Sequence, residues 1–162
     1  METISEVTAL VQPDVDLATG LVRLARVVQD VFARVSARHE LTATQARLLC
    51  VLTDGPKGMA KLAGILGVEK AAMTGLIDRL ERRGLVQRTA VPGDRRACHV
   101  ALTPSGERRA LAVHDEVGTD LDALTSSLSA TRRSELLRAV LDLTHASGLP
   151  AAVDAHRSGK VP

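Results

Sequence analysis

Residues 59–103, MAKLAGILGVEKAAMTGLIDRLERRGLVQRTAVPGDRRACHVALT, contain the pattern that decides the fold of this chain. Within this stretch four apolar residues recur at the i, i+3, i+4 and i+7 spacing of one helical face: Met73, Leu76, Ile77 and Leu80. The spacing predicts a helix over about 70–83 that packs its apolar side on a core. Gly67 precedes this helix and follows a short helix predicted over 59–66, so the stretch begins as a helix-turn-helix.

The same stretch ends in a predicted β-hairpin. Strands are expected over 85–91 and 97–102, the second because its apolar residues alternate. The turn between them, residues 92–96, begins with proline and glycine, which are typical of tight turns. A helix-turn-helix followed by such a hairpin is a winged helix-turn-helix, so the sequence predicts a mainly α fold with a small β-hairpin wing. The ligand expected for this fold is duplex DNA.

Basic charge is concentrated around the same stretch. Residues 57–109 carry eleven Lys and Arg against five Asp and Glu, whereas 1–56 and 110–162 each carry five basic and seven acidic residues. A basic centre between acidic flanks is typical of a surface that binds a polyanion. Taken alone, such a charge run also fits a solvated helical face. Two arginines on a projecting turn, Arg95 and Arg96, favour insertion into a nucleic-acid groove.

Further helices are predicted on both sides of this stretch. A long one begins at Asp16, an N-cap residue, and its leucines and valines recur at helical spacing to about residue 39. Thr42 and Gln45 have the spacing of a capping box that opens a second helix. Thr103 followed by Pro104 begins another long helix, because proline is favoured at the first helical position.

Composition excludes several classes of protein. The chain of 162 residues suits one domain, and Phe32 is its only aromatic residue, so aromatic stacking on bases is nearly excluded. No apolar run approaches the roughly 18 residues of a membrane span and the N-terminus lacks a signal-peptide pattern, so we expect a cytoplasmic protein without membrane contact. Cys50 and Cys98 fit neither a disulfide framework nor a paired metal motif. No catalytic constellation is evident, so an enzyme and a cofactor are not expected.

The motifs in residues 41–106 resemble those of the MarR family of bacterial transcription regulators. They are Leu41-Thr42-x-x-Gln45, Leu62-Ala63-x-x-Leu66-Gly67, Met73-Thr74-x-Leu76-Ile77-Asp78-Arg79-Leu80-Glu81-Arg82-Arg83-Gly84-Leu85-Val86, and Asp94-Arg95-Arg96-Ala97 followed by Leu102-Thr103-x-x-Gly106. The resemblance implies a homodimer that binds a palindromic operator in double-stranded DNA. Such a protein usually represses nearby genes until a small anionic or phenolic effector weakens its binding.

Outside these motifs the helices match the family only in length and order. They are too long and apolar for so small a domain to bury alone, so we expect them to supply the dimer interface. The predicted organisation is a leader at 1–15, a helical dimerisation region at 16–40 and 104–147, a winged helix-turn-helix DNA-binding lobe at 41–103, and a flexible tail at 148–162.

Four residues on the outward side of the helix at 70–83 are expected in the major groove: Lys70, Ala71, Thr74 and Gly75. Many family members carry an arginine where this chain has Gly75, which would remove one direct reader of guanine. The glycine fits close approach of the helix backbone to DNA, and it fits tight packing or a tolerated substitution equally well. The neighbouring charged residues are expected to form only ion pairs within the helix: Asp78, Glu81, Arg82 and Arg83.

The wing is expected to supply a second set of DNA contacts. Arg96 matches the arginine that the family inserts into the minor groove, and Asp94 matches the carboxylate that orients it. Taken alone, an Asp-x-Arg turn also fits a local salt bridge. Contacts that position the DNA backbone without reading sequence are expected from Arg95, Lys61, Arg79 and Thr44.

In the family the effector site lies between the dimer helices and the DNA-binding lobe. This placement implies four candidate effector-binding residues: His39, Arg47, Cys50 and His114. The two histidines fall near the zinc ligands of zinc-sensing members, but the further ligands of those sites are not evident, so no metal site is expected. A metal- or thiol-responsive regulator of the same fold stays an alternative, and a helical protein-interaction module is a second one.

Overall fold

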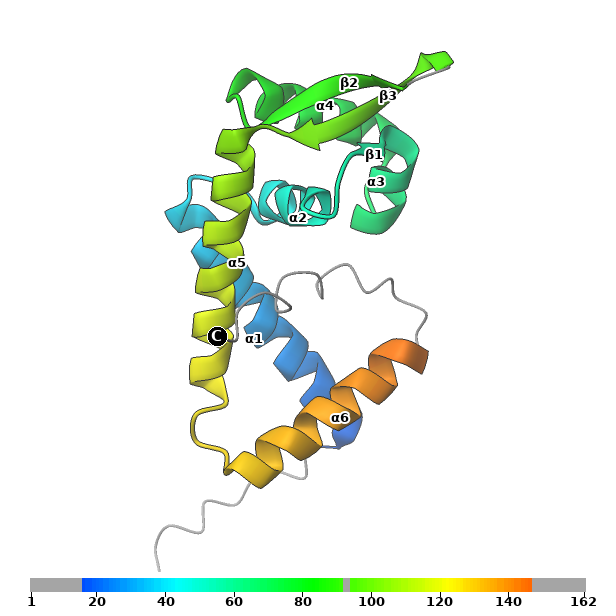
Figure 1. The fold of residues 1–162 in the computed structure, drawn as a ribbon. Coiled ribbons are helices and arrows are strands. Elements are labelled where there is room, and N and C mark those ends of the chain that lie inside the picture. Colours follow the sequence, from blue (N-terminus) through cyan, green and yellow to red (C-terminus); the bar gives the residue numbers. More distant parts are fainter. Residues whose placement is uncertain (1–15, 92–93, 147–162) are drawn as a thin grey trace, which may run out of the picture.

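The computed structural model describes residues 16–91 and 94–146, except for the side chains of residues 91 and 94–97. The predicted leader and tail, and part of the hairpin turn, lie outside the described residues. Helices and a three-stranded antiparallel sheet follow one another in the order α1, α2, β1, α3, α4, β2, β3, α5 and α6 (Figure 1). The predicted mainly α fold with a hairpin wing is therefore confirmed. No helix within the described ranges is long and apolar enough to cross a bilayer.

Two long helices, α1 (Leu17–Arg38) and α5 (Pro104–Leu124), support the lobe that carries the sheet (Figure 1). The carboxylate of Asp16 accepts a hydrogen bond of 2.7 Å from a backbone N–H of the first turn of α1, as predicted for an N-cap. The hydroxyl of Thr103 likewise accepts one of 3.1 Å from the backbone N–H of Gly106. Because α5 packs against α1 and also against α2, it joins the lobe to the long helices.

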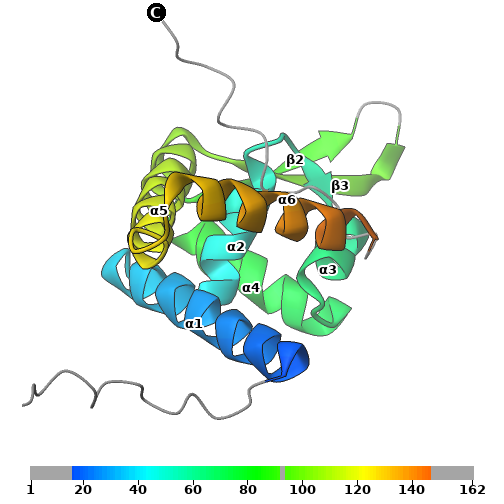
Figure 2. The same ribbon diagram turned by 90° about the horizontal axis from the view of Figure 1, so that it is seen from below.

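Helix α6 (Ala130–Ala146) follows α5 and turns back beneath the lobe (Figure 2). It crosses α1 in the view of Figure 1, but Figure 2 shows that the two helices lie apart. Large apolar side chains on both helices are consequently exposed: Leu17, Leu21, Val22, Leu24, Val27 and Val28 on α1, and Leu136, Leu137, Val140, Leu141 and Leu143 on α6. We call this set the open apolar surface. A surface of this kind is typical of an interface with another molecule.

Three helices build the core of the lobe: α2 (Ala43–Leu52), α3 (Met59–Leu66) and α4 (Lys70–Arg82). Each of the four apolar residues predicted to form a stripe on α4 is buried. They pack with buried leucines of α2 and α3, among them Leu48, Leu49 and Leu62. The predicted core side of α4 is therefore confirmed, and its other side is left to solvent.

Local sequence signals fix the ends of these helices as predicted. The capping box of α2 is complete, because Thr42 Oγ1 accepts a hydrogen bond of 3.2 Å from the Gln45 N–H while Gln45 Oε1 accepts one of 2.9 Å from the Thr42 N–H. After α3 and α4 the chain reverses at Gly67 and Gly84, whose φ angles are +63° and +68°. A positive φ is costly for residues with a Cβ, so glycine is the residue these turns require.

The wing consists of β2 (Val86–Val91) and β3 (Asp94–Leu102). The predicted start of the second strand at Ala97 is wrong, because antiparallel pairing with β2 continues past an irregularity at Ala90/Val91 to the pair Val91–Asp94. The backbone of residues 94–96 therefore belongs to a strand, and the turn is shorter than predicted.

A third strand, β1 (Lys57–Gly58), was not predicted. It pairs with β3 on the side opposite β2, with Lys57 opposite Val100 and Gly58 opposite His99. Two residues are too few to show the alternation from which a strand is predicted. The pairing fixes the segment before α3 to the wing, so that the helix-turn-helix and the wing share one sheet.

Candidate nucleic-acid interface

The outward side of α4 forms the first half of the candidate interface. Four of its predicted DNA-binding side chains are exposed, those of Lys70, Ala71, Thr74 and Arg79, and Gly75 is half-exposed. The Thr74 hydroxyl makes only a long hydrogen bond of 3.4 Å, to the Lys70 carbonyl. This surface therefore offers two cations and a hydroxyl, the groups that bond to phosphate oxygens and base edges.

No side chain of the described residues requires a glycine at position 75. A Cβ added there would have Arg79 Nη1 as its nearest neighbour, at 3.7 Å, which is an ordinary van der Waals distance. Tight packing against the described residues is thereby excluded as the reason for Gly75. Two explanations for the glycine are left: close approach of the helix backbone to DNA, and a tolerated substitution. In both cases the glycine costs roughly 1 kcal/mol of helix stability relative to alanine.

The remaining predicted DNA contacts are spread around α4. Lys61 is exposed on α3, and Thr44 is half-buried in the first turn of α2. Asp94, Arg95 and Arg96 have their backbone in β3, but their side chains lie outside the described residues. Helix α4 packs against β2, and both elements lie at the top of the lobe in Figure 1, so α4 and the wing are neighbours.

The ion pairing predicted within the helix at 70–83 is wrong, because the two acidic residues pair with β2 and neither arginine forms an ion pair within the described residues. Asp78 and Glu81 both pair with Arg88 of β2, and the Arg88 Nη2–Asp78 Oδ1 distance is 2.5 Å. The hydrogen bond with Asp78, helped by the charge of Glu81, raises the pKa of the Arg88 guanidinium. Arg83 Nη1 donates to the Glu40 carbonyl at 2.7 Å and so ties the end of α4 to the end of α1. Only Arg82 stays within the helix, donating to the Asp78 carbonyl at 3.3 Å.

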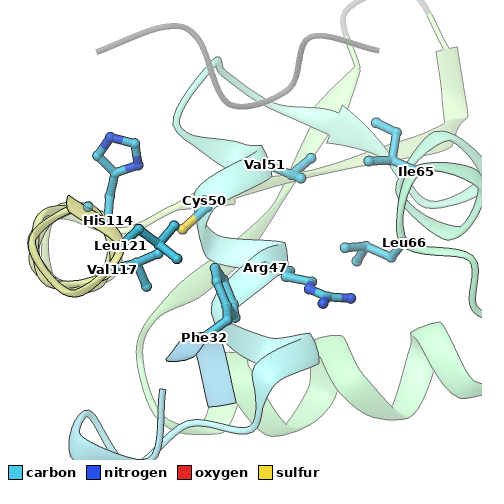
Figure 3. Close-up of a pocket in the computed structure, with 10 residues that line it drawn as sticks. Phe32, Arg47, Cys50, Val51, Ile65, Leu66, His114, Val117 and Leu121 are labelled. Carbon is cyan, nitrogen blue, oxygen red and sulfur yellow. The ribbon is translucent and has the colours of Figure 1, made fainter. Parts of the chain in front are cut away.

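A cavity of about 360 Å³ lies between α1, α2, α3 and α5 (Figure 3). Most of its wall is apolar, and three of the four predicted effector-binding residues line it: Arg47, Cys50 and His114. The other lining residues are Phe32, Val51, Ile65, Leu66, Val117, Gly118 and Leu121. The cavity thus lies where the long helices meet the lobe.

The fourth predicted effector residue, His39, does not line this cavity. It lies at the end of α1, where its Nε2 is 3.0 Å from Glu116 Oε1 of α5. The same carboxylate accepts a hydrogen bond of 3.1 Å from Arg38 Nε. His39 therefore belongs to a polar link between α1 and α5. Within the described part of the chain, no three His, Cys, Asp or Glu residues are grouped to hold a metal ion.

Phe32 is one of the cavity residues that were not predicted from the sequence. Its ring lies beneath the Arg47 guanidinium, with 5.5 Å between Cζ and the ring centroid. This distance is that of a cation–π contact, which leaves the guanidinium at the cavity wall (Figure 3). The available signal was that the only aromatic residue of the chain stands in a helix whose other apolar side chains are Leu, Val and Ala.

Cys50 is expected to react slowly with alkylating agents. Burial raises the pKa of its thiol to about 11, so at pH 8 it should carry about one hundredth of the thiolate of an ordinary cysteine. Iodoacetamide labelling of the Cys98→Ser variant, which retains Cys50, should accelerate strongly in denaturant. Equal rates for the folded and the denatured protein would contradict the partly buried placement of Cys50 and would support a thiol-responsive role.

Comparison of the sequence with known proteins finds its matches mainly in the part of the chain that forms the lobe. The sequence profile of the MarR family matches residues 41–98. The HTH-type transcriptional repressor NicR of Pseudomonas putida is 40% identical over 77 residues, which are 47% of this chain and 49% of NicR. The chain therefore spans about half the length of this curated relative.

Solved structures extend the similarity to the long helices. Wild-type apo MarR from E. coli superposes with a TM-score of 0.71 at 26% identity, covering 79% of this chain and 96% of that protein. The transcriptional repressor CouR, solved bound to a 23-mer DNA duplex, superposes with a TM-score of 0.67 at 30% identity. That match covers 80% of this chain and 92% of CouR.

Proposed function

Since this chain belongs to the MarR family, we propose that it is a ligand-responsive transcriptional repressor that binds a palindromic operator as a homodimer in the cytoplasm. The observation that carries the proposal is the division of α4 into two sides. Its apolar stripe is buried in the lobe, whereas Lys70, Thr74 and Arg79 are exposed beside the wing. A helix held in this way can enter the major groove without losing its support, and we therefore call α4 the recognition helix.

The homodimer in this proposal is supported by the open apolar surface on α1 and α6. Leaving so many leucines and valines in water is unfavourable, and a second copy of the chain would cover them. A two-fold dimer carries two copies of α4, and these reach successive major grooves on one DNA face when the half-sites are about 10 base pairs apart. The operator should therefore be palindromic.

The effector in this proposal is a small anionic or phenolic molecule bound in the cavity of Figure 3. An apolar wall with the Arg47 guanidinium at its edge suits a molecule with an apolar body and one acidic group. The cavity is bounded by α5 on one side and by α2 and α3 on the other. A bound molecule would therefore change the angle between the long helices and the lobe, and with it the spacing of the two recognition helices.

Footprinting on the DNA beside the gene tests the proposed function. A repressor should protect a palindromic site selectively in the presence of excess unrelated DNA, and saturation should require two chains per site. Binding without sequence preference would indicate an architectural DNA-binding protein, and no binding at all would overturn the proposal. Protection that disappears on addition of one compound from a panel of aromatic carboxylates would support the effector.

Substitutions on α4 should separate residues that read sequence from those that hold the DNA backbone. Lys70→Ala and Thr74→Ala, near the helix N-terminus, should change the base pairs selected from a randomised half-site. Arg79→Ala, further along the helix, should weaken all sequences alike and lower the slope of log affinity against log salt by about one. Altered selection by Arg79→Ala alone would mean that the helix is rotated differently in the groove.

A further inference from the structure

Arg88 links the wing to the recognition helix by two ion pairs. It is the only charged residue of β2, and its guanidinium lies between Asp78 and Glu81 of α4. The Arg88 backbone N–H also donates to Glu81 Oε1, at 3.3 Å. One strand residue is thus held by two carboxylates from successive turns of the helix. We call these three residues the helix–wing clamp.

By their charge alone, the two carboxylates of the clamp should weaken binding of the helix to DNA. Asp78 and Glu81 are partly exposed on the helix that is proposed to enter the major groove, where every phosphate repels them. Removing negative charge from such a helix ordinarily strengthens binding to a polyanion. Their presence on this helix therefore indicates a role that outweighs the repulsion.

The position of Arg88 along β2 indicates what that role is. The base of the wing is already fixed by two hydrogen bonds, because the Leu85 N–H donates to the Leu80 carbonyl at 3.0 Å and the Thr103 hydroxyl donates to the Gly84 carbonyl at 2.6 Å. Arg88 lies three residues beyond Leu85, opposite the buried Val100 of β3. The clamp therefore holds the strands at a second point, which restricts rotation of the wing about its base.

We infer that Arg88 is a positioning residue that sets the angle between the recognition helix and the wing, so that both elements meet DNA as one rigid unit. The inference rests on the proposed function, because the wing angle matters only if the helix and the wing engage the same duplex. Arg88 acts through Asp78 and Glu81 and does not itself contact phosphate. A clamp formed before binding removes the need to order the wing when DNA arrives.

The sign of one measurement distinguishes the clamp from simple electrostatics. In the Asp78→Asn, Glu81→Gln double variant, two negative charges are removed at constant side-chain size. If the clamp positions the wing, operator affinity should fall by about five- to tenfold even though the protein becomes more basic. If charge alone matters, affinity should rise. The control, Asp54→Asn with Glu107→Gln, removes the same charge from exposed positions outside the clamp, and its affinity should not fall.

The Arg88→Lys variant keeps the positive charge but loses the planar two-sided pairing, so it should weaken binding as the double variant does while leaving the salt slope unchanged. Circular dichroism at the assay temperature checks that every variant is folded, so a lower affinity cannot come from unfolding. Selective binding by the wild type together with unchanged or stronger binding by the double variant would overturn the clamp alone. No selective binding by the wild type would overturn the proposed function and the clamp with it.

Discussion

Gly106→Ala is expected to destabilise the fold by about 3–5 kcal/mol, the range of the most disruptive single substitutions. Gly106 lies in the first turn of α5, where a Cβ would come within 1.8 Å of the Leu85 carbonyl oxygen and 2.9 Å of its carbon. These are backbone atoms, so no side-chain rotation relieves the overlap. The same oxygen accepts a hydrogen bond of 3.1 Å from the Thr103 N–H. The alanine would therefore push α5 away from the base of the wing.

Urea denaturation followed by circular dichroism measures the effect, and Gly64→Ala is the matched control. Gly64 is also a helical glycine, in α3, but a Cβ there would meet nothing within 4 Å. Alanine at this exposed position should stabilise the protein by roughly 0.5–1 kcal/mol, because it lowers the conformational entropy of the unfolded chain. If both variants changed stability by the same amount, the close approach of α5 to Leu85 would be contradicted.

Features that depend on neighbours in sequence were predicted from the sequence with few errors. The apolar stripe of α4, the capping box at Thr42 and the helix ends at Gly67 and Gly84 all follow from spacings of at most a few residues. The outward side of α4 follows from the same stripe, because residues that are not on the core side must face elsewhere. The candidate DNA surface was therefore predictable together with the fold.

Features that depend on contacts between distant residues were not predictable. Asp78 and Glu81 stand at spacings that fit pairing within a helix, yet Arg88 reaches them because the turn at Gly84 folds β2 back along α4. Likewise Phe32 and Arg47 lie on different helices, and their contact follows from how α1 packs on α2. Periodicity gives the side of a helix on which a residue lies but not the element that it meets there.

Replacing two leucines of α6 by glutamate is expected to convert the proposed dimer to a monomer and to lower operator affinity by about a hundredfold or more. Leu137 and Leu141 are 58% and 41% exposed in the single chain, so charging them removes little from its core. In a dimer the two glutamates would be buried against apolar side chains without a counter-ion, which is strongly unfavourable. The monomer retains one recognition helix and loses the gain from two half-sites bound together.

Sedimentation velocity and a gel shift on the same preparations check this expectation. Arg138→Glu serves as the control, because it changes the net charge by the same amount as the double leucine variant but lies just outside the apolar stripe of α6. It should remain dimeric and bind DNA with only the modest loss that its charge causes. A double leucine variant that still sedimented as a dimer would show that the open apolar surface of α6 is covered by something other than a second copy. A monomer that kept full operator affinity would show instead that one lobe is sufficient, and the palindromic operator would then lose its physical basis.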